Sequence, residues 1–142
     1  MVTRSASASY EGLGKEGKGQ ITTQSGVLQG SPYGFGTRFE DGPGTNPEEL
    51  IAAAHAGCFT MALSGQLGQA GMTAQQLETS ATVSLDKVGD SFAITAVHLE
   101  LVATIPGASE EAFQEAARKA KEGCPVSKLF NAEITLDAKL VA

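Results

Sequence analysis

Residues suited to cross-linking or metal binding are scarce in this sequence. Its 142 residues include two cysteines, Cys58 and Cys124, and two histidines, His55 and His98. The cysteines lie far apart in the chain and neither belongs to a CxxC pair, whereas the ligands of a structural zinc ion are usually spaced more tightly. We therefore expect reduced thiols and no metal site.

Positive charge is also scarce. The chain has ten Lys and Arg residues against sixteen Asp and Glu residues, a net charge of −6 at pH 7. Where basic residues gather, at Arg118, Lys119 and Lys121, they are offset by Glu115 and Glu122. Because nucleic-acid-binding proteins usually carry a basic stripe, the composition argues against a nucleic-acid partner.

Long apolar runs are missing as well. No run approaches the roughly 18–20 apolar residues that span a bilayer, so we expect no membrane segment. Residues 1–10 lack the apolar core of a secretory signal. Cysteines in a chain without such a signal are reduced by default, which predicts a cytoplasmic protein.

The first third of the chain is rich in Gly, Ser and Thr and contains three short segments suited to strands, at residues 6–11, 19–24 and 34–39. Glycine-containing turns separate them, at residues 14–17 and 30–32. We predict an antiparallel meander with one face in water.

A helix start is indicated by the run Thr45-Asn46-Pro47-Glu48-Glu49. A capping side chain precedes a proline at the first helical position, and two carboxylates lie at the positive end of the dipole. The helix should continue to about Gly71. Its apolar residues cover a wide arc, which predicts burial on more than one side and, in a chain this small, cover from another subunit.

The remaining chain alternates in the manner of two long strands, at residues 76–87 and 92–105. Ser109 caps a helix that Gly123 ends, a short helix opens at Cys124-Pro125, and a last strand covers residues 132–141. With no repeat and no linker, the sequence predicts a single α+β domain of residues 1–142.

Each cysteine admits two interpretations. Cys58 lies among small and apolar residues of the long helix, where a free cysteine usually acts as a small hydrophobic side chain. Cys124 falls at a helix N-terminus, where unpaired amides and the dipole favour the thiolate. From spacing alone Cys124 is the better nucleophile, and a structural role is equally open for it.

Four further side chains have ordinary interpretations beside their chemical ones. Arg38 stands among aromatic residues, on which such stems usually pack. Glu48 at a helix start is usually a dipole partner. His55, one turn before Cys58, is a candidate acid or base for the thiol, although such a histidine more often packs. His98 is expected in solvent.

Seven short motifs extend over nearly the whole chain. They are Pro32-Tyr33-Gly34-Phe35, Thr37-Arg38-Phe39-Glu40, Gly44-Thr45-Asn46-Pro47-Glu48-Glu49-Leu50, Ala54-His55-Ala56, Cys58-Phe59, Val83-Ser84-Leu85-Asp86-Lys87-Val88 and Gly123-Cys124-Pro125-Val126-Ser127. Together they resemble the OsmC/Ohr family. In the Ohr branch the arginine lies earlier, where only Arg4 occurs here, so Arg38 favours the OsmC branch.

The resemblance implies an OsmC-like α+β fold, with antiparallel sheets packed around a long central helix in an intertwined homodimer. It implies a thiol-dependent peroxidase that reduces organic hydroperoxides to alcohols without a cofactor. Cys58 would attack the peroxide, Cys124 would resolve the sulfenic acid as a disulfide, and a dithiol (lipoyl-type or a small thiol) would reduce it. Arg38, held by Glu48, would supply the cation that a mid-helix thiol needs to ionise.

Two positional arguments accompany this assignment. Glu48 and Cys58 are ten residues apart on one predicted helix, hence about 15 Å apart along its axis and about 80° apart around it. We therefore expect a dimer in which Glu48 serves the partner's thiol. Apolar residues should line the approach to Cys58 and favour peroxides with organic tails, namely Leu50, Ile51, Phe59, Met61, Phe35 and Phe39.

Two alternatives remain. The first is a non-catalytic, stress-related binding protein with structural cysteines, which predicts a Cys58 inert to peroxide. The second is a thiol hydrolase or transferase that uses Cys58 and His55, which predicts that His55→Ala is inactive and Arg38→Ala is tolerated. The fold alone does not decide between them, because one fold hosts many functions.

Overall fold

The computed structural model describes residues 1–141, in two compact units that meet in sequence at Leu50 and Ile51. Each unit is described by itself below. Together they contain two three-stranded sheets and the helices α1 to α4, so the α+β class is confirmed. The count of one domain stays a prediction.

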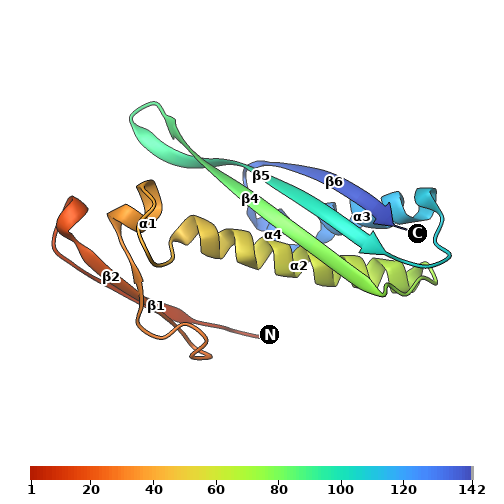
Figure 1. Ribbon diagram of the computed structural model, residues 1–142, viewed down its shortest axis with the longest axis horizontal. Coiled ribbons are helices and arrows are strands. Elements are labelled where there is room, and N and C mark those ends of the chain that lie inside the picture. Colours follow the sequence, from red (N-terminus) through yellow and green to blue (C-terminus); the bar gives the residue numbers. More distant parts are fainter. Residues whose placement is uncertain (142) are drawn as a thin grey trace. The chain divides into compact units, whose positions relative to one another are not determined.

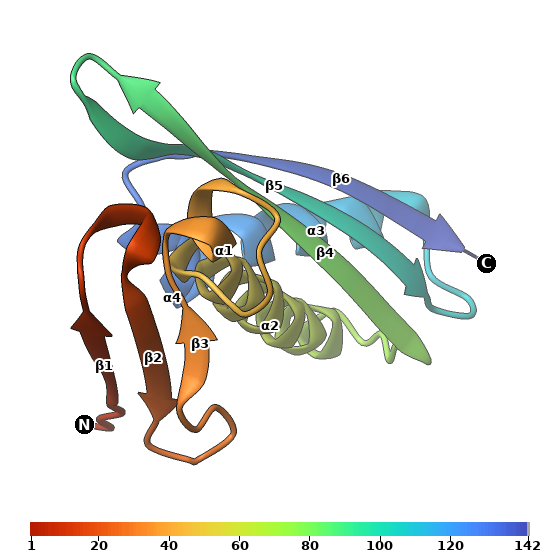
Figure 2. The same cartoon turned by 60° about the vertical axis from the view of Figure 1, so that its left-hand side comes forward.

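The first unit, Met1–Leu50, is built on an antiparallel sheet in the order β1-β2-β3 (Figure 2). Its strands are β1 (Ala6–Glu11), β2 (Lys18–Thr23) and β3 (Ser31–Tyr33), with a 3₁₀ turn, η1 (Gly14–Glu16), between the first two. The meander is confirmed. The prediction of a single wet face is wrong for β1, since all six of its residues are exposed.

The strand predicted at residues 34–39 is wrong, because these residues form a short helix, α1 (Phe35–Phe39). The Thr37 hydroxyl accepts a hydrogen bond from the Gly34 amide at 2.8 Å and donates to the Gly34 carbonyl at 3.0 Å. The Arg38 amide donates to the same carbonyl at 3.1 Å. These local bonds satisfy the backbone without a neighbouring strand.

The long helix α2 (Pro47–Gln69) begins where the sequence predicts. Asn46 is its cap, since its Oδ1 accepts from the Glu49 amide at 2.7 Å. The helix is continuous for 23 residues. Gly71 follows it with φ of 78°, a left-handed conformation that glycine adopts without strain.

By length and composition alone, α2 is long and apolar enough to cross a membrane, a test that the core helix of a soluble protein also passes, so the expectation of no membrane segment stays a prediction. Glycines and uncharged polar residues interrupt the apolar run without adding charge after Glu49. Its buried side chains, however, repeat every four residues along one face, at His55, Phe59, Leu63 and Leu67. That is the pattern of a helix packed in a protein core.

The second unit contains β4 (Gln76–Val88), β5 (Ser91–Thr104), α3 (Glu110–Gly123), α4 (Pro125–Leu129) and β6 (Glu133–Val141) (Figure 1). The sheet order is β4-β5-β6, in which β4 is antiparallel and β6 parallel to β5. The expectation of purely antiparallel sheets is therefore wrong. The chain passes through α3 and α4 after β5, and such a helical crossover returns the next strand in the same direction.

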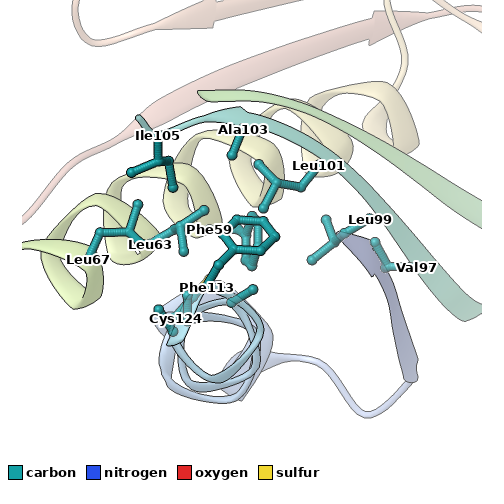
Figure 3. Packing of buried hydrophobic residues seen from close by; sticks show 13 residues of the cluster. Phe59, Leu63, Leu67, Val97, Leu99, Leu101, Ala103, Ile105, Phe113 and Cys124 are labelled. Carbon is teal, nitrogen blue, oxygen red and sulfur yellow. The ribbon is translucent and has the colours of Figure 1, made fainter. Parts of the chain in front are cut away.

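The core of this unit lies between β5 and the helices α2 and α3 (Figure 3). Alternate residues of β5 point into it, while Glu100 and Val102 on the opposite face are exposed. The fully buried members include Phe59, Leu63 and Leu67 from α2, Val97, Leu99, Leu101 and Ala103 from β5, Ile105, and Phe113 and Ala117 from α3. Cys124 belongs to this cluster and Cys58 packs against it.

Candidate active site

The two cysteines meet in the core of the second unit. Their Sγ atoms are 3.1 Å apart and hydrogen-bonded, although the residues are 66 positions apart in sequence. Both are free thiols, with Cys124 fully buried and Cys58 half-buried. Because a disulfide bond is about 2.05 Å long, the sulfurs need to approach by only about 1 Å to form one.

Cys124 is held in place from both sides. Its amide donates to the Ala120 carbonyl at 3.0 Å and ends α3. Its side chain then caps α4, because Sγ accepts from the Ser127 amide at 3.5 Å. Pro125 at the first helical position fixes the direction of the chain. One cysteine thus joins two helices and presents its sulfur to α2.

The two thiols differ in acidity. Burial, together with the hydrogen bond to Cys124, raises the pKa of Cys58. Burial also acts to raise the pKa of Cys124, but hydrogen bonds with Cys58, Ser127 and the Val126 amide outweigh it and lower that pKa. This order agrees with the acidity expected from spacing, and the causes acting on Cys58 include no positive charge.

Arg38 and Glu48 form a bidentate ion pair within the first unit. Nε and Nη2 of the guanidinium donate to Oε1 and Oε2 of the carboxylate, each at 3.0 Å. The Glu48 side chain is 12% exposed and that of Arg38 is 39% exposed, so the carboxylate is the better shielded member. The guanidinium also lies 5.5 Å from the centroid of the Phe39 ring. Two parallel bonds and an aromatic contact fix its plane.

Asn46 connects the elements that carry this ion pair. Its Nδ2 donates to the Thr37 carbonyl in α1 at 2.7 Å, while its Oδ1 caps α2. Arg38 follows Thr37 and Glu48 follows the cap by two residues, so one amide side chain aligns both. Asn46 was recognised in the sequence as a candidate cap, but its second contact depends on α1, which the sequence did not predict.

His55 is fully buried, and its Nε2 lies 2.7 Å from the Ser127 hydroxyl. Its other ring nitrogen, Nδ1, has no hydrogen-bond partner. Neither nitrogen is bonded to Cys58, so the geometry does not support a Cys58–His55 dyad and the hydrolase that it would serve. Sequence reasoning missed Ser127 as a functional candidate. Its signal is the Cys-Pro-x-Ser spacing, which places a hydroxyl three residues after a capping sulfur.

The predicted site residues thus form two pairs. The thiol pair belongs to the unit that begins at Ile51 and the ion pair to Met1–Leu50. His98, on β5, belongs to neither pair. Its Nδ1 is hydrogen-bonded to the Thr135 hydroxyl at 2.6 Å. Across residues 1–141, no group of three or more His, Cys, Asp or Glu side chains is arranged to hold a metal ion.

Two free thiols in contact in the core of an α+β protein are the arrangement that a thiol-dependent oxidoreductase would use. Comparison with known proteins sharpens this class. The model of the OsmC-like protein family matches residues 40–139. The chain is 53% identical over 139 residues to Peroxiredoxin OsmC of Escherichia coli (strain K12), which covers 98% of this chain and 97% of that protein.

More distant relatives point the same way. A Staphylococcus aureus (strain USA300) protein described as organic hydroperoxide resistance protein-like is 35% identical over 98 residues, 68% of this chain and 69% of its own. The crystal structure of the organic hydroperoxide resistance protein OhrB of Bacillus subtilis superposes with a TM-score of 0.67 at 28% identity, covering 96% of this chain and 98% of that one. The chain belongs to the OsmC-like protein family, and it is a peroxidase.

Proposed function

We propose that the protein reduces organic hydroperoxides to alcohols through a Cys58 sulfenic acid and a Cys58–Cys124 disulfide. The Cys58 thiolate attacks the terminal peroxide oxygen, the O–O bond breaks, and the alkoxide leaves with a proton as an alcohol. The Cys58 sulfenic acid then condenses with Cys124, which forms the disulfide and releases water. The 3.1 Å contact between the two sulfurs is the observation that carries this proposal.

Arg38 is proposed as the group that activates Cys58. Burial raises the pKa of this thiol, so it needs a nearby positive charge to ionise near neutral pH. The guanidinium is already fixed by Glu48 through two bonds, which leaves its remaining N–H groups to bind a peroxide oxygen. Glu48 would act through Arg38 and not on the substrate.

The disulfide would be reduced by a dithiol, either of the lipoyl type or a small thiol. Thiol–disulfide exchange requires an external thiolate to reach one sulfur. Cys58, half-buried, is the more accessible of the two. The cycle needs no cofactor, because the peroxide supplies the oxidising equivalents and the dithiol the reducing ones. We place this cycle in the cytoplasm, where thiol reductants keep cysteines reduced.

The active unit is proposed to be a homodimer with shared sites. Glu48 and Cys58 both belong to the continuous helix α2, in which ten residues correspond to about 15 Å of rise. The side of α2 away from its buried face is also open and carries no charge after Glu49, with Met61 79% exposed. A second copy would cover this side and bring its own Glu48 toward Cys58 of the first.

Apolar residues near the ion pair favour a substrate with an organic tail. Phe35 and Phe39 pack against each other with ring centroids 5.1 Å apart, next to Arg38. Phe59, which the sequence also placed on this approach, is instead fully buried in the core. Second-order rates should therefore be higher for a bulky alkyl hydroperoxide than for hydrogen peroxide, and equal rates would count against an apolar approach.

Single-cysteine variants test the proposed roles. Cys58→Ser should consume no hydroperoxide, because it lacks the attacking sulfur. Cys124→Ser should react once and stop, with a sulfenic acid on Cys58 that dimedone traps. Single-turnover activity in Cys58→Ser would exchange the two roles, and loss of that first turnover in Cys124→Ser would remove the assignment of Cys58 as the peroxidatic residue.

A further inference from the structure

His55 and Ser127 form a buried polar pair that the peroxide cycle above does not use. The pair is the buried polar part of the core among residues 1–141, with His55 fully buried and Ser127 8% exposed. The Ser127 hydroxyl lies 2.7 Å from His55 Nε2, and the imidazole packs nearly perpendicular to the Phe130 ring with the centroids 5.2 Å apart. Burying polar groups is unfavourable unless they are hydrogen-bonded. A pair kept in an otherwise apolar core therefore calls for an explanation.

The hydrogen-bond partners indicate which way the hydrogens point. His55 Nδ1 is buried without a partner. A buried N–H without an acceptor is rarer in proteins than an unpaired acceptor, so the imidazole hydrogen belongs on Nε2. Burial lowers the pKa of His55 and keeps the ring neutral near pH 7. Nε2 then donates to Ser127 Oγ, and the serine hydroxyl keeps its own hydrogen for another acceptor.

The nearest sulfur on the same helical turn is that of Cys124, whose Sγ accepts from the Ser127 amide at 3.5 Å. The Ser127 side chain is also among the groups that lower the pKa of Cys124. Ser127 therefore acts on Cys124 through both its amide and its side chain. Both favour the charged form of the thiol, since hydrogen bonds to an anion are about twice as strong as those between neutral groups.

We propose that Ser127, oriented by His55, is a positioning residue that holds Cys124 as a thiolate while its bond to Cys58 forms and breaks. This inference rests on the proposed cycle. In the resolving step the Cys124 thiolate attacks the Cys58 sulfenic sulfur, the S–S bond forms, the S–O bond breaks, and hydroxide leaves with a proton as water. In the reducing step a thiolate of the external dithiol attacks Cys58, and Cys124 leaves as the thiolate that Ser127 stabilises.

The same contacts decide which sulfur the reductant attacks. The thiol with the lower pKa is the better leaving group in disulfide exchange, and here that thiol is Cys124. The mixed disulfide with the dithiol should therefore form on Cys58.

Rapid mixing with one equivalent of cumene hydroperoxide separates the two oxidative steps. Ser127→Ala should form the Cys58 sulfenic acid at the rate of the unsubstituted protein but close the disulfide about tenfold more slowly. Ser127→Thr, which keeps the hydroxyl, should restore the rate. His55→Gln keeps a donor near Ser127 and should fall between them. Ser109→Ala is the matched control: it removes the serine that caps α3 through the Ala112 amide, without touching Cys124.

A second readout does not depend on peroxidase activity. In a Cys58→Ser background, Cys58 no longer titrates beside Cys124, and ultraviolet absorbance follows the Cys124 thiolate against pH. Adding Ser127→Ala should move its midpoint upward by about one pH unit, whereas adding Ser109→Ala should not. An unchanged midpoint with an unchanged disulfide rate would overturn the inference. Failure of the unsubstituted protein to form any sulfenic acid would instead overturn the proposed function, and the titration would still decide the role of Ser127.

Discussion

The two units of this protein divide the predicted chemistry between them and differ sharply in how they are built. The unit that begins at Ile51 has a core of aromatic and aliphatic side chains, and its two sulfurs lie within or against that core. In Met1–Leu50 the one buried residue is Gly19. Its ordering comes from strand pairing and from local polar contacts such as those of Thr37 and Asn46.

This contrast gives a physical reason why a thiol and its proposed activating cation should be carried by differently built parts. A core restrains Cys58 and Cys124 but also raises the pKa of Cys58 by desolvation. A guanidinium is expensive to bury, and the short helix α1 that carries Arg38 leaves it partly exposed. The unit Met1–Leu50 buries little apolar surface of its own, so the surface that a second subunit would bury adds most to its stability.

The largest expected effect concerns the stability of the two units. Phe113→Ala removes a fully buried ring from α3 and should lower the free energy of unfolding by about 3–5 kcal/mol. Tyr10→Ala, at a position 44% exposed on β1, should cost about 1 kcal/mol or less. Urea unfolding of both variants at one fixed protein concentration gives the comparison. Equal losses would mean that the first unit is as well packed as the second.

The next effect concerns the cation. Arg38→Ala should lower kcat/KM for a hydroperoxide by about 100-fold at neutral pH. Without the guanidinium, burial keeps the pKa of Cys58 raised, so less thiolate exists at a given pH and activity should recover as the pH rises. The measurement is the pH profile of the second-order rate constant, with Arg38→Lys as the control that keeps the charge and loses the fork. An unshifted profile would remove Arg38 as the activating group.

Mixing inactive subunits tests whether the two pairs act across chains. Cys58→Ser and Glu48→Ala homodimers should each be inactive. After exchange in equal amounts, half of the dimers should be mixed and hold one intact site of two, so about a quarter of the full activity should return. Light scattering or tagged subunits would establish that exchange occurred. No recovery after proven exchange would place Glu48 and Cys58 of one chain in the same site.

The smallest effect concerns the side chain that aligns the ion pair. Asn46→Asp keeps the acceptor that caps α2 but loses the donor to the Thr37 carbonyl. Helix content by circular dichroism should therefore be unchanged, while kcat/KM should fall by about tenfold. Asn46→Ala, which loses both contacts, is the harsher comparison. Full activity in Asn46→Asp would show that α1 holds Arg38 without this bond.

Much of this fold could be predicted from the sequence where local signals act alone. The start of α2 at Pro47, the cap at Ser109 and the long strands β4 and β5 all follow from capping residues or strict alternation. Residues 34–39 misled because their aromatic and threonine residues suit a strand, whereas the Thr37 hydroxyl closes a helical turn. The direction of β6 depends on the crossover through α3 and α4, which alternation does not report.

The site residues could also be predicted only as far as local motifs reach. Cys58, Cys124, Arg38 and Glu48 were all identified from motifs, and the contacts within each pair are long-range or depend on helix ends. Spacing alone ranked Cys124 as the more acidic thiol, in agreement with its position at the cap of α4. Ser127 could not be assigned from its type, because its significance comes from a histidine 72 positions away.

Mass spectrometry after addition of one equivalent of an alkyl hydroperoxide tests the central claim most directly. The account predicts a protein lighter by two hydrogen atoms, with a peptide map that joins Cys58 to Cys124 within one chain. Added dithiothreitol should restore the original mass. A protein that keeps both thiols, or that gains oxygen on Cys58 without ever forming the Cys58–Cys124 link, would contradict the proposed cycle.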